Sequence, residues 1–187
     1  MKKLLFILAA ALIGFQSQAQ ESTFNSGNVV FNAGIGFGTA LYRGVGYRST
    51  LPPVSISGEY GLMEDFITEK MTLGIGGYLG FASSKFTSTF GNEEWGYKYN
   101  YTVIGVRGAV HYPLVDKLDT YGGLMISYNA VSVKEVGEVP VGNSSESGRV
   151  GFSAYVGGRY YFSEHFAGMA ELGYGIAYLN LGIAYKL

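Results

Sequence analysis

The sequence predicts an all-β fold, an eight-stranded antiparallel up-and-down transmembrane β-barrel. Three observations predict it. Apolar side chains recur at every second position along most of the chain, which is typical of strands because successive side chains point to opposite faces. Charged residues make up only 14% of the chain, whereas soluble domains average about 25%. The chain also contains 29 glycines and 16 tyrosines.

The first 19 residues have the pattern of a secretory signal peptide. Lys2 and Lys3 precede an apolar run, Leu4–Phe15, and small residues at Ser17 and Ala19 fit a cleavage site. The run is shorter than the roughly 20 apolar residues that a membrane-spanning helix needs. We expect this segment to be removed and residues 20–187 to form a single barrel domain, with eleven basic and fourteen acidic residues and a net charge of −3.

Eight segments carry the alternation, and the last one ends at the C-terminus. They are Val29–Leu41, Val54–Leu62, Met71–Phe81, Val103–Tyr112, Gly123–Asn129, Val150–Phe162, Met169–Tyr174 and Leu179–Leu187. In each segment one face is an uncharged wall of Val, Ile, Leu, Phe and Tyr, and the other is mostly Gly, Ser, Ala and Asn. Small residues suit the narrow bore of an eight-stranded barrel, and the uncharged wall suits lipid. We interpret the apolar wall as lipid-facing; a soluble periplasmic sandwich is the alternative.

The connections between these segments alternate in length. With the N-terminus taken as periplasmic, we expect outer loops at Tyr42–Pro53, Ser83–Gly96, Val133–Gly148 and a short turn at Gly175–Ala177, and inner turns at Met63–Lys70, Pro113–Leu118 and Ser163–Phe166. Three long outer loops and short inner turns are typical of bacterial outer-membrane barrels. The stretch Phe86–Phe90 leaves open whether the strands continue into the loops.

The last 21 residues, AGMAELGYGIAYLNLGIAYKL, resemble the closing hairpin of small outer-membrane barrels of the OmpA-like or porin-like superfamily. The alternating residues Leu181, Ile183, Tyr185 and Leu187 resemble the C-terminal signal read by the barrel assembly machinery, although that signal most often ends in Phe. The resemblance implies a monomeric protein of the bacterial outer membrane, in contact with its lipid and lipopolysaccharide and recognised by the assembly machinery. It does not imply one activity, because a fold hosts many.

Four charged residues alternate with the apolar wall along their strands and therefore point into the predicted lumen, where they fall in about one layer. They are Glu59, Arg107, Arg159 and Glu171. Two carboxylates and two guanidinium groups can neutralise each other, and buried charges need such pairing. We expect an ionic plug that fixes strand register and closes the bore. A gate over a narrow ion path is the alternative interpretation.

The residues that catalysis would need are missing or misplaced. His111 falls at the inner rim and His165 in an inner turn, so we expect both to be solvated and neither to serve as a base near the outer leaflet. The chain has no cysteine, and its histidines and acids show no metal-ligand spacing. We therefore predict no enzyme, no cofactor and no metal, and the mild net charge gives no reason to expect nucleic acid as a partner.

The outer loops are the remaining candidates for binding. Tyr42, Arg43, Tyr47 and Arg48 combine aromatic and basic side chains, and Trp95 lies in the second loop. Such residues fit lipopolysaccharide phosphates or a glycan, although anchoring at the membrane interface explains the aromatics equally well. We expect a structural or loop-mediated interaction role with a plugged lumen. The alternatives are a narrow porin-like channel and, less favoured, a lipid-modifying enzyme.

Overall fold

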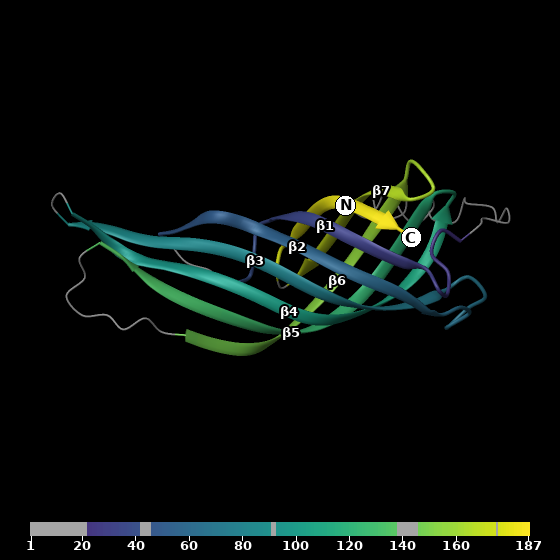
Figure 1. The fold of residues 1–187 in the computed structure, drawn as a ribbon, viewed down its shortest axis with the longest axis horizontal. Coiled ribbons are helices and arrows are strands. Elements are labelled where there is room, and N and C mark those ends of the chain that lie inside the picture. The colour runs from purple at the N-terminus through teal and green to yellow at the C-terminus, as the bar shows by residue number, and fades with distance from the viewer. Residues whose placement is uncertain (1–21, 42–45, 91–92, 138–145, 175) are drawn as a thin grey trace, which may run out of the picture.

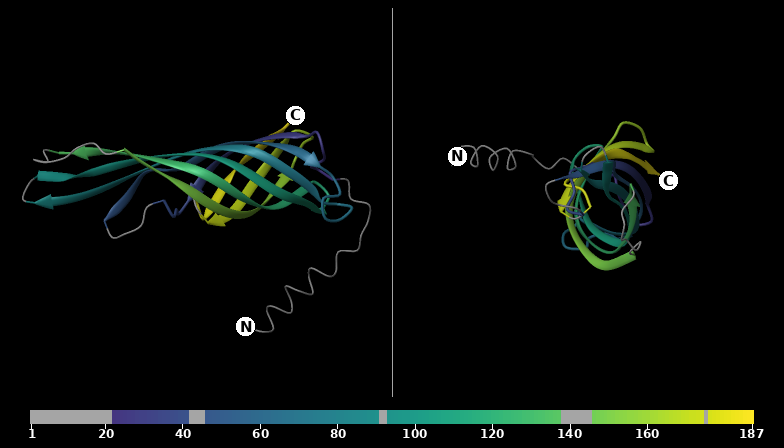
Figure 2. Two further views of the ribbon diagram at one scale, coloured as in Figure 1. Left: turned by 90° about the horizontal axis from the view of Figure 1, so that it is seen from below. Right: turned by 90° about the vertical axis from the view of Figure 1, so that its left-hand side faces the viewer.

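The computed structural model describes residues 22–41, 46–90, 93–137, 146–174 and 176–187. It contains eight strands, each hydrogen-bonded to its neighbours in the chain, and the first also pairs with the last. They are β1 (Val29–Phe37), β2 (Tyr47–Met63), β3 (Thr72–Phe90), β4 (Glu93–Val115), β5 (Leu118–Val136), β6 (Glu146–Tyr161), β7 (Phe166–Tyr174) and β8 (Leu179–Lys186). The predicted eight-stranded antiparallel barrel is confirmed, and the view along its long axis shows the ring (Figure 2).

Closure of the ring depends on pairing between the first and the last strand. β1 and β8 are in antiparallel register from Val30, opposite Lys186, to Phe37, opposite Leu179. Every strand therefore has a neighbour on both sides in the closed part of the barrel, so backbone hydrogen bonds can be completed there without water. In the described part of the chain, no helix is long and apolar enough to cross a membrane.

The two faces of the wall differ as the alternation predicts. Along β5, Leu124, Ile126 and Tyr128 are exposed on the outside, whereas Met125 and Ser127 between them are buried inside. The same outward apolar surface continues around the barrel on the other strands, with exposed side chains such as Phe31, Ile56, Ile104, Phe152 and Ile183.

The central strands extend well beyond the closed ring. β1, β7 and β8 have eight or nine residues, whereas β2 to β6 have 16 to 23. Beyond the ring, β3 to β5 continue side by side as an open, curved sheet flanked by β2 and β6, seen at the left of Figure 1. We call this part the outer sheet.

The outer sheet corrects the predicted outer loops. Most of Ser83–Gly96 is strand, because β3 continues to Phe90 and β4 begins at Glu93. β2 already begins at Tyr47, and the third predicted loop is shortened by the ends of β5 and β6. The turn between β7 and β8 and the inner turns at 64–71, 116–117 and 162–165 lie where they were predicted, with boundaries shifted by one to three residues.

Candidate functional site

Each of the four predicted lumen residues comes from a different strand, and all four are buried inside the barrel. Glu59 lies on β2, Arg107 on β4, Arg159 on β6 and Glu171 on β7, and none is more than 7% exposed. The structure brings them together as two ion pairs. Arg159 Nη2 contacts Glu59 Oε2, and Arg107 Nη2 lies 2.5 Å from Glu171 Oε1.

The first pair belongs to a closed ring of four side chains. Arg159 Nη1 also donates to Asp119 Oδ2 over 3.1 Å, Asp119 Oδ1 lies 2.8 Å from His111 Nδ1, and His111 Nε2 lies 3.1 Å from Glu59 Oε1. We call Glu59, Arg159, Asp119 and His111 the ionic ring. With both carboxylates ionised, both imidazole contacts are hydrogen bonds only if each ring nitrogen carries a proton. The four groups then have no net charge, which is what a buried cluster requires.

The ionic ring overturns the prediction for His111. The side chain was expected at a solvated rim, but it is 2% exposed and contacts two carboxylates. His111 lies four residues after Arg107 on β4, so the two side chains point to the same side of the strand. This even spacing is the sequence signal for an inward histidine. Asp119 was missed because β5 begins at Leu118 and not near Gly123. The other histidine, His165, lies exposed in the inner turn, with Nδ1 2.8 Å from the carbonyl oxygen of Lys186.

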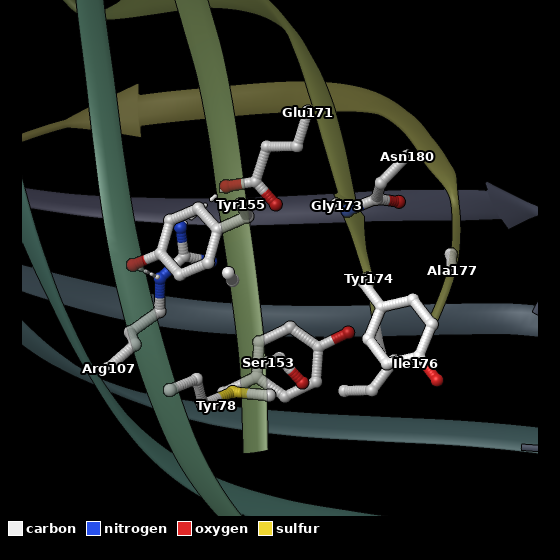
Figure 3. Close-up of a pocket in the computed structure, with 12 residues that line it drawn as sticks. Tyr78, Arg107, Ser153, Tyr155, Glu171, Gly173, Tyr174, Ile176, Ala177 and Asn180 are labelled. Carbon is white, nitrogen blue, oxygen red and sulfur yellow. Dashed lines mark hydrogen bonds and ion pairs between the residues drawn. The ribbon is translucent and has the colours of Figure 1, made fainter. Parts of the chain in front are cut away.

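The second pair is enclosed by tyrosines. Arg107 Nε donates to the Tyr155 hydroxyl over 2.8 Å, and the Arg107 guanidinium lies 4.0 Å from the Tyr155 ring centroid. Figure 3 shows Arg107, Tyr155 and Glu171 converging on one another. The Tyr121 hydroxyl donates to Glu171 Oε1 over 2.9 Å, and the Arg159 guanidinium lies 4.6 Å from the Tyr121 ring centroid. Tyr121 therefore connects the second pair to the ionic ring.

A segment before the first strand closes the inner mouth of the barrel. Residues 22–28, which we call the N-terminal cap, place Phe24 inside, where it is 1% exposed and packs in one cluster with Val30, Tyr161, Ala167 and Ala184. Polar contacts hold the cap on two sides. Lys186 Nζ donates to the Thr23 carbonyl oxygen over 3.2 Å, and the Ser26 amide donates to Glu64 Oε1 over 2.9 Å.

Apolar side chains lie on the opposite, outer side of the charged layer. Ile176, from the turn between β7 and β8, packs with Val103 and Met125, and Leu41 and Tyr78 pack against this group. The Thr39 hydroxyl donates to the Ile176 carbonyl oxygen and ties the turn to the segment after β1. A cavity of about 50 Å³ lies between this group and the second ion pair (Figure 3), which is room for a few water molecules.

The residues proposed for outer recognition are separated by the structure. Tyr42 and Arg43 lie outside the described residues. Tyr47 and Arg48 begin β2, and Trp95 lies on β4, so they belong to the outer sheet and not to loops. Tyr47 packs against Phe86 and Tyr99, with ring centroids 5.4 and 5.6 Å apart. Arg48, its neighbour in sequence, is exposed on the other face of the sheet.

The C-terminal residues lie on the outer surface of the closing strand. Leu181, Ile183 and Tyr185 are exposed on β8, and Leu187 follows its last residue. Tyr185 packs against Phe166, with ring centroids 5.0 Å apart. The alternation quoted from the sequence therefore faces outward along the strand that closes the ring.

A closed ring of strands with an apolar outer wall and a charged, filled interior defines an integral membrane β-barrel. The comparison with family models agrees with this class. Residues 6–184 match the model described as "Outer membrane protein beta-barrel domain", and the chain belongs to this family. It is a protein of the bacterial outer membrane. No curated protein sequence matches the chain.

Solved structures of other small barrels resemble the fold at low sequence identity. The attachment invasion locus protein Ail of Yersinia pestis, solved with the heparin analogue sucrose octasulfate, is 11% identical over 87% of this chain and 99% of its own, with a TM-score of 0.54. OprG of Pseudomonas aeruginosa is 11% identical over 88% and 97%, with a TM-score of 0.48. The N-terminal barrel domain of Pseudomonas aeruginosa OprF is 15% identical over 87% and 98%, with a TM-score of 0.45.

Proposed function

We propose that this chain is a closed structural barrel that anchors its outer sheet at the cell surface and neither conducts ions nor catalyses a reaction. One observation carries the proposal: the lumen is filled in three successive layers. Phe24 fills the inner end, the two linked ion-pair groups fill the middle, and the cluster around Ile176 covers the outer side.

The middle layer supports a permanent plug better than a gate. An ion path through it would require Arg159 to leave both Glu59 and Asp119, although Arg159 is fully buried. Breaking a buried ion pair by losing one partner typically costs about 3–5 kcal/mol. Because each charged group here has two partners, a change at one site disturbs the others as well.

The positions of the histidines support a role without catalysis. His111 lies between the carboxylates of the ionic ring and under Phe24, where no substrate reaches it without displacing the N-terminal cap. His165 lies in an inner turn, on the side opposite the outer sheet. Neither is near an outer serine that it could activate as a base.

The outward residues of β8 support two further parts of the proposal. Leu181, Ile183, Tyr185 and Leu187 form the segment by which the barrel assembly machinery would recognise the chain. Because β8 also pairs with β1 to complete the ring, the barrel is proposed to act as a monomer. An Ile183→Asp and Tyr185→Asp double variant should then accumulate unassembled in cells, even though the wild-type chain assembles under the same conditions.

The decisive experiment is single-channel recording of the refolded protein in a planar bilayer. Heat-modifiable gel migration first confirms that the barrel is folded. We expect a silent wild type. We expect discrete openings in a variant that removes side chains from all three layers: Phe24→Ser, Arg107→Ala, Arg159→Ala and Ile176→Ser. A Phe31→Ser and Ile183→Ser double variant on the outer surface serves as the matched control and should stay silent. Steady wild-type openings that change in Glu171→Gln would overturn the proposal in favour of a narrow channel.

A further inference from the structure

The register of the outer sheet places four basic residues side by side. Arg48 on β2 pairs with Lys85 on β3, Lys85 pairs with Lys98 on β4, and Lys98 pairs with Lys134 on β5. We call these four residues the cation row. Since neighbouring strands lie about 4.8 Å apart, the row is about 14 Å long.

The cation row lies on the same face of the sheet as the lipid-facing wall. Paired residues on neighbouring strands point to the same side, and β4 keeps an unbroken register between Lys98 and the exposed Ile104, six residues away. The buried residues Tyr101 and Val103 have the opposite parity and point inward. Arg48, Lys98 and Lys134 are exposed, and Lys85 is half-buried.

The row lies beyond the outer edge of the apolar wall, on the same strands. Lys85 lies four residues beyond Phe81, the last large apolar outward residue of β3, and Lys134 lies six beyond Tyr128 on β5. At about 3.3 Å per residue these separations are about 13 and 20 Å along the strands, and the usual strand tilt of about 40° shortens them along the membrane normal. Polar residues, Ser83, Asn100 and Ser132, occupy the register positions between the apolar wall and the row.

Four cations in adjacent cross-strand positions repel one another. Among the residues whose side chains the structure describes, the register places Glu146, which is opposite Ser132, near Lys134 on the same face. Glu135, next to Lys134 in sequence, has the opposite parity and points to the other face. A ligand with several closely spaced negative charges would relieve the repulsion.

We propose that the cation row binds the phosphate groups of lipopolysaccharide in the surrounding outer leaflet. The row continues the lipid-facing surface, so a lipid whose acyl chains pack against the apolar wall presents its phosphates to the exposed cations Lys98 and Lys134. The binding holds the base of the outer sheet at the membrane surface. Lipopolysaccharide binding by the cation row does not depend on whether the lumen is closed, so failure of this proposal would leave the proposed closed barrel intact, and the reverse holds as well.

The test measures lipopolysaccharide binding by the folded protein in phosphatidylcholine nanodiscs. The Lys98→Gln and Lys134→Gln double variant removes two adjacent exposed cations of the row. Each cation near an anionic lipid surface contributes about 1 kcal/mol, so binding should weaken by about tenfold or more. The Lys70→Gln and Lys117→Gln double variant removes two cations from the inner turns and should bind like the wild type.

Two further arms make the result specific. Dephosphorylated lipopolysaccharide should bind the wild type as weakly as intact lipopolysaccharide binds the Lys98→Gln and Lys134→Gln variant. The Lys98→Arg and Lys134→Arg double variant, which keeps both positive charges, should bind intact lipopolysaccharide like the wild type. Equal binding by the test and control variants would overturn the proposal. The proposal would also be overturned if the protein in nanodiscs bound soluble dextran sulfate and showed no preference for lipopolysaccharide over it.

Discussion

The ring of Phe24 is stacked on the imidazole of His111, with 4.1 Å between the ring centroids and 30° between the ring planes. The contact joins the N-terminal cap to the ionic ring on β2, β4, β5 and β6. The inner end of the lumen is therefore closed by a residue that precedes the first strand, and the charged layer is shielded from the inner side by an aromatic ring.

Replacing Phe24 with Ala should lower the free energy of unfolding by about 3 kcal/mol, because a buried aromatic side chain is lost and a cavity remains. The measurement is urea unfolding of the refolded barrel in lipid vesicles. Phe66→Ala is the control, since Phe66 is exposed in the inner turn between β2 and β3. Equal midpoints for the two variants would mean that the cap contributes nothing to stability.

Replacing Glu171 with Ala should destabilise the barrel by about 3–5 kcal/mol, because Arg107 then keeps a buried charge without its carboxylate partner. The double variant Glu171→Ala with Arg107→Met should be more stable than Glu171→Ala alone, since the unpaired charge is gone. Glu164→Ala, in the exposed turn between β6 and β7, is the matched control. An unchanged urea midpoint for Glu171→Ala would contradict the role of this pair as a plug.

Asp119→Asn tests the ionic ring without changing its shape. The amide has one oxygen to accept hydrogen bonds, whereas the carboxylate now serves both Arg159 and His111. Because hydrogen bonds to charged groups contribute about 1.5–3 kcal/mol each, we expect a loss of about 2 kcal/mol or more in urea unfolding. The neighbouring Asp116→Asn, in the two-residue turn, should change stability by less than about 0.5 kcal/mol. A similar effect of both changes would show that the ring is not a stabilising unit.

Gly61→Ala should displace the N-terminal cap. A Cβ at Gly61 would lie 2.1 Å from the Asn25 carbonyl oxygen, whereas a Cβ at Gly77, on the outer surface, would meet nothing within 4 Å. We expect Gly61→Ala to lower the urea midpoint and Gly77→Ala to leave it nearly unchanged.

If both Gly61→Ala and Phe24→Ala act by releasing the cap, their double variant should cost less than the sum of the single losses. Full additivity would mean that the alanine at position 61 damages β2 itself and not the contact with Asn25.

The sequence predicted the closed part of the barrel well because its pattern reports a local property. Successive residues such as Leu124, Met125 and Ile126 point in turn to the outer and the inner side of the barrel wall. Lipid disfavours charged side chains on the outer side. The pattern is weaker in the outer sheet, where both faces meet water. Lys85, Lys98 and Lys134 stand on the outward face in place of apolar residues, so the lipid-facing signal ends before them and these stretches were assigned to loops.

The lumen was predictable only in part. Parity identified Glu59, Arg107, Arg159 and Glu171 as inward, because side-chain direction follows from position along a strand. Which carboxylate meets which guanidinium depends on the register between strands that are distant in sequence, and that register also recruits Asp119 and His111. Phe24 lies outside every strand, so no periodicity pointed to it.

The sequence by itself therefore determined the number of strands, their antiparallel order and which side chains face lipid, since each of these depends on local alternation and on the solvent that each face meets. Only the tertiary structure decided how the lumen is filled and where the cations of the outer sheet align. Those features arise where residues distant in sequence are brought together by the fold, such as Glu59 and Arg159, which are 100 positions apart.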